Sequence, residues 1–466
     1  MGEYLHSFMK LPGISLSTLI IAVFCGFLTP FDLSAVNIAL PAIASEFSLD
    51  AIELSWVSSA YLLASAIFLV PFGRIGDIFG RKKILIGGIA LFTLASIGMI
   101  FSASSIMLIS FRLVQGIGAS MIFGTAVAIL TSVTSPARRG QALGVYTTSV
   151  YLGLSAGPFI GGILTDDFGW RSIFLINVPI GVLIIALILF YLKGEWADAA
   201  GERFDLRGAL IYGSSLTAVM IGFSELPHVT GFIALGLGIT LLTLFIWLEN
   251  REQYPLIRVS MFRKNRVFAC SNVAALINYG STFAITFFLS LYLQYIRGFD
   301  PQEAGFILVT QPVVQAIFSS YAGSLSDKIE PAKISSLGMG IIAAGLVSLS
   351  FLSPETSMIE LMVILAVLGF GFALFSSPNT NAIMSSVEKR YYGIASGTLG
   401  TMRLLGQMLS MGIAMMIIAV MVGKVDITPD VSDELMSAMS IGFVIFSVMC
   451  FIGIFFSMVR GNIRTE

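Results

Sequence analysis

Charged side chains are scarce in this sequence. Only 11% of its 466 residues are Asp, Glu, Lys or Arg, and 56% are hydrophobic. Soluble domains contain about 25% charged residues, so this chain has too little polar surface to face water. A soluble protein is therefore excluded, and we expect an integral membrane protein. The net charge of −1 also argues against a nucleic-acid partner.

Histidine and cysteine are also rare. The two histidines are His6 and His228, and the three cysteines, Cys25, Cys270 and Cys450, each lie alone in an apolar run. This pattern provides neither a metal site nor a disulfide framework. No G-x-x-x-x-G-K-[ST] motif occurs, and the predicted loops are too short for a soluble catalytic domain. We therefore expect neither an enzyme nor an ATP-driven pump, and no cofactor.

Long apolar runs fill most of the chain. A helix needs about 20 apolar residues to cross the hydrocarbon core, and the first run is too long for the apolar region of a signal peptide. The sequence predicts fourteen spans, near 16–42, 52–72, 84–102, 104–131, 141–164, 172–192, 207–225, 231–248, 267–295, 303–323, 333–352, 357–384, 391–422 and 437–459.

The basic residues orient these spans. An even number of spans places both termini on one side of the membrane. With the N-terminus in the cytoplasm, 21 of the 26 Lys and Arg residues are cytoplasmic and three, Arg171, Arg297 and Lys424, are external. Cytoplasmic loops carry an excess of Lys and Arg, so this orientation is the expected one. The remaining two, Arg112 and Arg403, fall within spans.

Two loops share a short pattern. The loop after the second span reads "GRIGDIFGRKK" (73–83), and the loop after the tenth reads "GSLSDK" (323–328). Both contain G-x-[IL]-x-D, and both follow the second helix of a six-helix block. We therefore predict six helices in residues 1–192, an insertion of two helices in 193–266, and six helices again in 267–466. Related halves with a site between them are a common transporter plan.

Five segments follow one another in an order typical of one transporter family. "FDLSAVNIALP" (31–41) lies in the first span, "GRIGDIFGRKK" follows the second, and "SFRLVQGIGAS" (110–120) lies in the fourth. "GLSAGPFIGG" (153–162) lies in the fifth, and "WRSIFLINVPIG" (170–181) opens the sixth. Together they resemble the motifs of the major facilitator superfamily, and within it the fourteen-helix drug:proton antiporter family. The resemblance covers almost the whole chain.

The resemblance implies an all-α integral membrane protein with the major facilitator fold. This fold has two six-helix bundles, here with two additional helices, and both termini in the cytoplasm. It also implies a cytoplasmic gate, in which Asp77 contacts the start of the span at 391–422 with support from Arg74 or Arg81. From residue types alone, the loop could instead be a basic anchor. The gate residues expected are Gly73, Arg74, Asp77, Gly80, Arg81 and Asp327.

Glycines in the fifth span recur every four residues. Gly153, Gly157 and Gly161 therefore lie on one helix face, where another backbone can approach closely, and Pro158 can bend the helix. The spacing alone fits close packing. The resemblance implies an exporter whose cavity is sealed on one side by this motif, which comprises Gly153, Gly157, Pro158, Gly161 and Gly162.

Three ionisable residues lie deep within spans: Asp32, Arg112 and Arg403. Such residues are costly in the membrane and are functional candidates by default. At about 1.5 Å per residue, Asp32 and Arg112 both lie roughly 12 Å from the outer ends of their helices. We expect them to share a water-filled cavity and to pair, with Asp32 as proton acceptor and Arg112 as its modulator. A fixed ion pair without mechanistic use is the alternative.

Substrate contacts are less well marked. Polar groups in a membrane need partners, so each candidate also fits a plain interhelical hydrogen bond, and Arg403 also fits a role in binding helix-end carbonyls. The residues expected to line a substrate cavity are Tyr61, Asn278, Tyr279, Gln311, Gln315, Arg403 and Gln407.

The sequence predicts a secondary active transporter that exports drug-like or amphipathic small molecules in exchange for protons by alternating access. We expect it to be a monomer in the cytoplasmic membrane, driven by the proton gradient, without a metal. The alternative is a proton-coupled exporter or symporter for one endogenous metabolite. A receptor or scaffold that transports nothing is a third interpretation, but it requires neither the repeat nor the buried charges.

Overall fold

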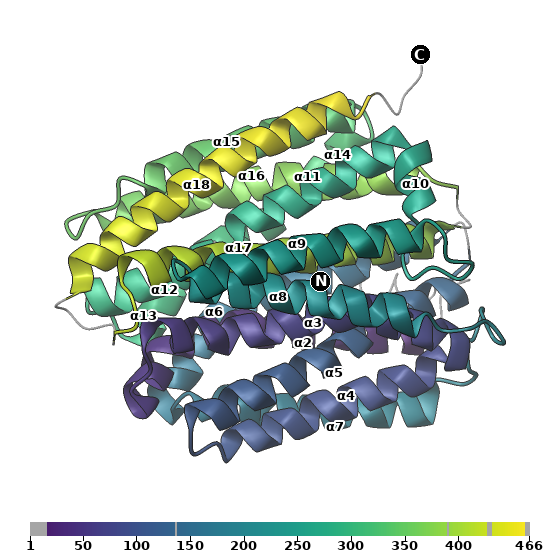
Figure 1. Cartoon of the computed structure of the whole chain (residues 1–466), viewed down its shortest axis with the longest axis horizontal. Coiled ribbons are helices and arrows are strands. Elements are labelled where there is room, and N and C mark those ends of the chain that lie inside the picture. The colour runs from purple at the N-terminus through teal and green to yellow at the C-terminus, as the bar shows by residue number, and fades with distance from the viewer. Residues whose placement is uncertain (1–15, 136–137, 389–390, 426–430, 462–466) are drawn as a thin grey trace, which may run out of the picture.

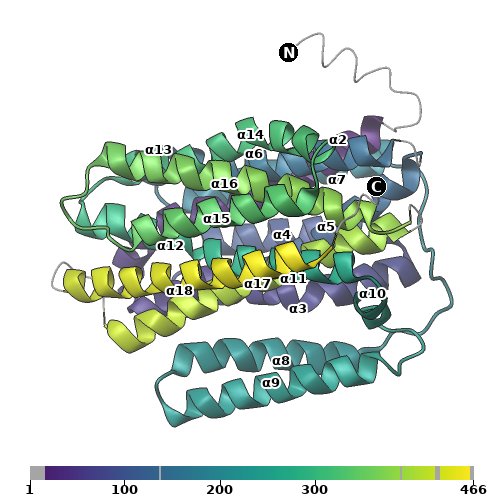
Figure 2. The same cartoon turned by 90° about the horizontal axis from the view of Figure 1, so that it is seen from above.

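The computed structural model describes residues 16–135, 138–388, 391–425 and 431–461. Within them, fourteen helical segments are long and apolar enough to cross a membrane. The segments lie roughly along one direction, and α2 begins at the same end of the molecule at which α18 finishes (Figure 2). The predicted all-α class and the number of spans are therefore confirmed.

The first group of helices is drawn in purple and blue in Figure 1. Polar side chains start several of these helices: Asp50 accepts hydrogen bonds from the backbone N–H groups of Ile52 and Glu53 at 2.8 Å, which satisfies donors that a helix start leaves free. The group comprises α2 (Leu16–Phe47), α3 (Ala51–Phe79), α4 (Arg81–Ile100), α5 (Ser105–Val133), α6 (Arg139–Phe168) and α7 (Arg171–Tyr191).

A hairpin of two helices, α8 (Leu206–Glu225) and α9 (Val229–Glu249), lies along one side of the other spans (Figure 2). Helix α8 contacts the first group. The hydroxyl of Tyr212 donates a hydrogen bond to the carbonyl of Ala66 on α3 at 3.2 Å. The short helix α10 (Val259–Lys264) then leads to the second group.

The second group is drawn in green and yellow in Figure 1. Two of its spans are interrupted. The backbone N–H of Ala284 donates to the Ser410 hydroxyl at 3.0 Å instead of to its own helix, and Pro312 has no N–H to donate. The elements are α11 (Arg266–Thr282), α12 (Ala284–Leu291), the π-helix η1 (Tyr292–Ile296), α13 (Pro301–Leu308), α14 (Thr310–Ser326), α15 (Pro331–Leu349), α16 (Met358–Ser385), α17 (Tyr392–Met421) and α18 (Ser432–Val459).

The two ends of the molecule differ in charge. We call the end with the loops at 192–205, 250–265 and 327–330 the basic end, because most Lys and Arg residues lie there. We call the other end, with the loops at 48–50 and 297–300, the acidic end. The basic end is the predicted cytoplasmic side. The division of the chain into units 1–192, 193–266 and 267–466 stays a prediction.

Candidate functional site

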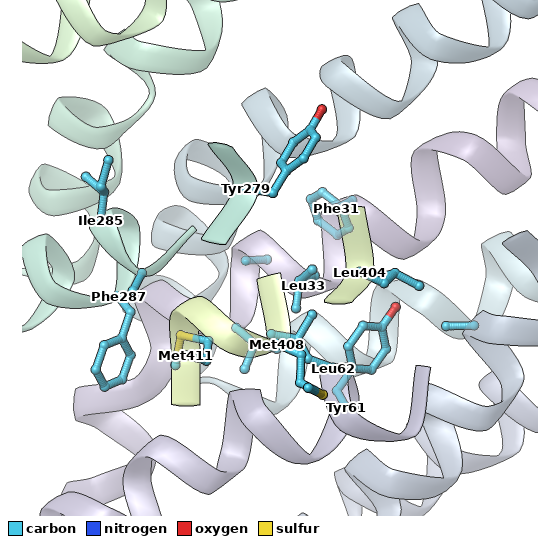
Figure 3. Close-up of a cluster of buried hydrophobic side chains, with 14 of the residues drawn as sticks. Phe31, Leu33, Tyr61, Leu62, Tyr279, Ile285, Phe287, Leu404, Met408 and Met411 are labelled. Carbon is cyan, nitrogen blue, oxygen red and sulfur yellow. The ribbon is translucent and has the colours of Figure 1, made fainter. Parts of the chain in front are cut away.

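A cavity of about 1130 Å³ lies between the two groups of helices. Its mouth is at the basic end, where Arg74 and Asp327 come from opposite groups. Its deep end lies near the middle of the spans. Figure 3 shows three of the side chains that line it there, Leu33, Tyr61 and Tyr279, from α2, α3 and α11.

At the acidic end the two groups are joined by hydrogen bonds. Ser290 and Gln294, from α12 and η1, donate to the carbonyls of Asn37 and Ile38 on α2, at 2.8 and 3.0 Å. The backbone N–H of Ala51 donates to the carbonyl of Val425 at 3.0 Å. The structure therefore has a conformation that is open at the basic end and closed at the acidic end.

The glycine motif of α6 contacts helices of both groups. A Cβ on Gly153 would lie 2.5 Å from the Phe27 carbonyl, and the other two glycines of the face also press α6 against α2. On another face, a Cβ on Gly162 would lie 2.5 Å from the carbonyl of Pro301 on α13, and Gly305 approaches the carbonyl of Pro158. The motif thus packs α6 within its own group and against the other one.

Asp32 and Arg112 form an ion pair inside the first group. Arg112 Nη1 lies 2.7 Å from Asp32 Oδ2, and both side chains are fully buried. Asp32 Oδ1 accepts two more hydrogen bonds, from Gln115 Nε2 at 3.0 Å and from Asn177 Nδ2 at 2.6 Å. The expected pairing is therefore direct, and two amides complete it.

Arg112 has further partners. Its Nε donates to the Val57 carbonyl at 3.0 Å, and its Nη1 lies 2.5 Å from Gln115 Oε1. Its guanidinium carbon lies 4.5 Å from the ring centroid of Tyr61. Because Tyr61 also lines the cavity, this ring separates the ion pair from the cavity.

The expectation that Asp32 and Arg112 share the cavity is corrected, since neither lines it. Thr29, Pro30 and Leu33 on α2 line the cavity. Asp32 instead contacts Arg112, Gln115 and Asn177 and is fully buried, so it faces the interior of the first group.

Three residues of this network were not predicted: Gln115, Asn177 and Ser96. The Ser96 hydroxyl accepts a hydrogen bond from Gln115 Nε2 at 3.0 Å. Gln115 lies three residues after Arg112, on the same helix face, and Asn177 is a polar residue in a predicted span. These two features could have marked Gln115 and Asn177 as candidates from the sequence.

The carboxylate of Asp77 contacts Arg81 at 2.6 Å, four residues further on. Arg81 also binds Asp198 at 2.8 Å and the Ser132 hydroxyl at 2.7 Å. Asp77 and Tyr392, at the start of α17, both line the cavity mouth, and among the described residues no bond joins Asp77 to that helix. The expected gate contact is thus not formed in this open conformation.

The other gate residues surround the same turn. Arg74 pairs with Glu202 in the loop before α8, and Gly73 lines the cavity. Gly80 has a φ of 116°, a conformation that side chains other than glycine's disfavour. Asp327, in the matching loop of the second group, accepts a hydrogen bond from Asn381 Nδ2 at 3.1 Å. Their role as a gate stays a prediction.

Four of the seven predicted substrate residues line the cavity: Tyr61, Tyr279, Arg403 and Gln407. The other three do not. Asn278 precedes Tyr279 and is turned by about 100° from it, so it is fully buried away from the cavity. On α14 the cavity reaches Ser319, one turn short of Gln315 and two turns short of Gln311.

Arg403 faces the cavity from α17. Its guanidinium carbon lies 5.1 Å from the ring centroid of Tyr279, and its buried Nε has no hydrogen-bond partner. Of the two roles left open by the sequence, the structure therefore favours cavity lining over the binding of helix-end carbonyls.

The sequence matches the family model described as Major Facilitator Superfamily over residues 22–411, and again over residues 272–462. The chain belongs to this superfamily. It is therefore a multi-pass membrane protein that transports small molecules, and it is not an enzyme.

Similar proteins agree with this assignment. The "Riboflavin transporter RibZ" of Clostridioides difficile (strain 630) is 32% identical over 398 residues, which cover 85% of this chain and 86% of that protein. The "Multidrug resistance protein Stp" of Mycobacterium tuberculosis (strain CDC 1551 / Oshkosh) is 30% identical, over 82% of this chain and 71% of that protein. Relatives of the multidrug type and the fourteen spans confirm the resemblance to the fourteen-helix antiporters.

A solved structure shows the same fold. The bacterial homologue of the human lysosomal transporter Spinster has a TM-score of 0.66 and 17% sequence identity, over 95% of this chain and 96% of that one.

Proposed function

We propose that this transporter exports drug-like or amphipathic small molecules in exchange for protons by alternating access. It acts as a monomer in the cytoplasmic membrane, with its basic end in the cytoplasm. The cavity described above then faces the cytoplasm and is closed toward the outside. The similarity to a multidrug resistance protein supports export, and the tyrosine rings among polar residues in the cavity support an amphipathic cargo.

The observation that carries this proposal is the buried pair of Asp32 and Arg112 behind the cavity wall. Asp32 accepts hydrogen bonds from Arg112 and from two amides and is fully buried, an arrangement that fits a carboxylate with its counter-charge. Protonation neutralises Asp32 and leaves the charge of Arg112 without its partner. That change gives the proton a different free energy of binding in the two conformations, which is what biases an equilibrium between them.

The proposed cycle starts from this conformation. Cargo binds from the cytoplasm while Asp32 is ionised and paired. The acidic end then opens and the basic end closes, with Asp77 and its loop as the gate. Asp32 takes up a proton from outside after the cargo leaves, and it releases that proton to the cytoplasm when the ion pair forms again.

A proton-coupled transporter for one endogenous metabolite is the second candidate. It is favoured by the relative named as a riboflavin transporter, which is 32% identical to this chain. A transporter of this kind accepts one compound of a chemical panel and rejects the others, whereas a drug exporter accepts many.

The test uses the purified protein in liposomes with an imposed pH gradient. A panel of amphipathic dyes and riboflavin is offered as cargo, and internal pH is followed with a trapped indicator. We expect gradient-driven movement of several dyes, each with a counterflow of protons. Movement of riboflavin alone would favour the second candidate.

The variant Asp32→Asn should still bind dye but move no protons. Asp433→Asn is the matched control, since Asp433 is an exposed residue in the first turn of α18, and it should behave like the wild type. Cargo movement that neither responds to the gradient nor moves protons would refute antiport. Full coupling in Asp32→Asn would refute the assignment of the proton site.

A further inference from the structure

The deep part of the cavity is rich in tyrosine. Tyr61 from α3, Tyr146 and Tyr151 from α6, and Tyr279 from α11 all line it. The hydroxyl of Tyr146 is buried without a hydrogen-bond partner. Tyrosines offer flat apolar faces with a polar edge, and such rings pack well against another aromatic ring. The residues around this space therefore fit a flat aromatic compound with polar substituents.

Arg403 is the charged residue of this deep region. It lies eleven residues into α17, about 16 Å from the basic end of that helix. Among the described residues it forms no ion pair with a carboxylate, its Nε is buried and unpartnered, and its guanidinium carbon lies 5.1 Å from the ring centroid of Tyr279. A charge at this depth is costly unless it is paired, so an anion bound beside it would supply what the protein does not.

Most other charges near the cavity are already neutralised, and the exceptions among the described residues, Arg258 and Asp327, lie at its mouth. At the mouth, Arg74 is paired with Glu202, and Arg81 is paired with Asp77 and Asp198. Behind the wall, Asp32 is held by Arg112 and two amides. A cation in the deep region would therefore meet Arg403 and no free carboxylate among the described residues, although tyrosine rings alone can bind cations.

We propose that the deep cavity selects flat aromatic compounds that carry an anionic group, and that Arg403 binds this group while Tyr61 and Tyr279 stack on the ring. This inference rests on the proposed function, because it names the class of cargo for that transporter. Arginine suits the role, since its planar fork of donors matches a carboxylate. The bound anion neutralises Arg403, and the ring stacks against the face of Tyr61 opposite Arg112.

Binding is tested with two dyes that share the xanthene ring. Fluorescein is an anion in mildly alkaline buffer, and the methyl ester of tetramethylrhodamine is a cation. Fluorescence anisotropy with the purified protein in lipid nanodiscs should show that fluorescein binds about ten-fold or more tightly than the cationic dye. Arg403→Gln should weaken fluorescein binding by about ten-fold or more, as expected when a charge-assisted hydrogen bond is lost.

Two control variants sharpen this result. Arg258→Gln removes the same charge from an exposed position at the mouth and should change fluorescein binding by less than about two-fold. Arg403→Lys keeps the charge but loses the planar fork, so its affinity should lie between those of the wild type and Arg403→Gln. The cationic dye should bind Arg403→Gln at least as well as it binds the wild type.

A second measurement needs no variant and so does not depend on folding of Arg403→Gln. Naphthoate and naphthamide share one ring and differ in charge, and naphthoate should displace fluorescein about ten-fold better. Equal displacement would overturn the inference. So would binding of neither dye, tighter binding of the cationic dye, or an equal loss of both dyes in Arg403→Gln.

Liposome transport separates this inference from the proposed function. Proton-coupled movement of the cationic dye without binding of fluorescein would overturn the inference and leave the antiporter standing. Binding of fluorescein as described, with no gradient-driven movement of either dye, would overturn the antiporter and leave the anion-binding cavity standing.

Discussion

Replacement of Asp32 by asparagine should destabilise the protein strongly, even though the two side chains have almost the same shape. Asp32 accepts three hydrogen bonds with two oxygens, whereas asparagine has one oxygen and two N–H donors. Its amide nitrogen would face Arg112 Nη1 or the two amide donors. The guanidinium of Arg112 would also stay buried without its counter-charge.

The expected cost follows from that burial. Removal of one partner of a buried ion pair costs about 3–5 kcal/mol, and Asp32 and Arg112 are fully buried. The double variant Asp32→Asn/Arg112→Gln removes both charges together, so it should lose less stability than the sum of the two single variants, by about 1–3 kcal/mol.

Thermal unfolding in detergent micelles, at a fixed heating rate, measures these differences as shifts of the apparent midpoint. Asp433→Asn serves again as the control and should leave the midpoint unchanged. A midpoint for Asp32→Asn equal to that of the wild type would mean that Asp32 is already neutral in this conformation. Strict additivity in the double variant would mean that the 2.7 Å contact carries no coupling. Either result would refute the reasoning.

Three further changes test other parts of the structure. Asn177→Leu removes the shortest hydrogen bond to Asp32 and should cost about 1–3 kcal/mol in the same unfolding assay; an unchanged midpoint would argue against its part in the network. Gly157→Ala should destabilise the protein, because the new Cβ would overlap the Ser34 hydroxyl. Gly144→Ala, on the same helix with open space around it, should instead stabilise the protein by about 0.4–1 kcal/mol. Asp77→Asn should change the unfolding midpoint little, since Asp77 is partly exposed and Arg81 keeps Ser132 and Asp198 as partners. It should slow transport in liposomes, and full transport would remove support for the gate.

The spans could be predicted to within a few residues at most of their ends, because the bilayer requires long apolar segments and charged loops interrupt them. The largest miss is α3, which continues to Phe79 where the predicted span ends at 72. The predicted span 172–192 is α7 (Arg171–Tyr191), for example. The interruption at Phe283 could not be foreseen, since it depends on a hydroxyl from α17, far along the chain. The break between α13 and α14, by contrast, could be predicted from Pro312 in the sequence.

The sequence predicts how deep each site residue lies in the membrane, but not which way its side chain points. Depth along a helix follows from counting residues, and it placed Asp32 beside Arg112. Direction depends on how each helix is rotated within the bundle, which no local pattern fixes. For this reason Asn278 and Tyr279 looked equally suitable, although Tyr279 lines the cavity and Asn278 is buried away from it.

The separation of Asp32 from the cavity has a consequence for the mechanism. If a proton-binding carboxylate lined the cavity, a cationic cargo and the proton would compete for it directly. Here Tyr61 stands between the two, with one face against Arg112 and the cavity beyond. If Asp32 is the proton site, as proposed, cargo and proton do not compete for one atom, and their coupling passes through the conformations that each stabilises. Such a transporter is free to accept a cargo whose charge is unlike that of a proton.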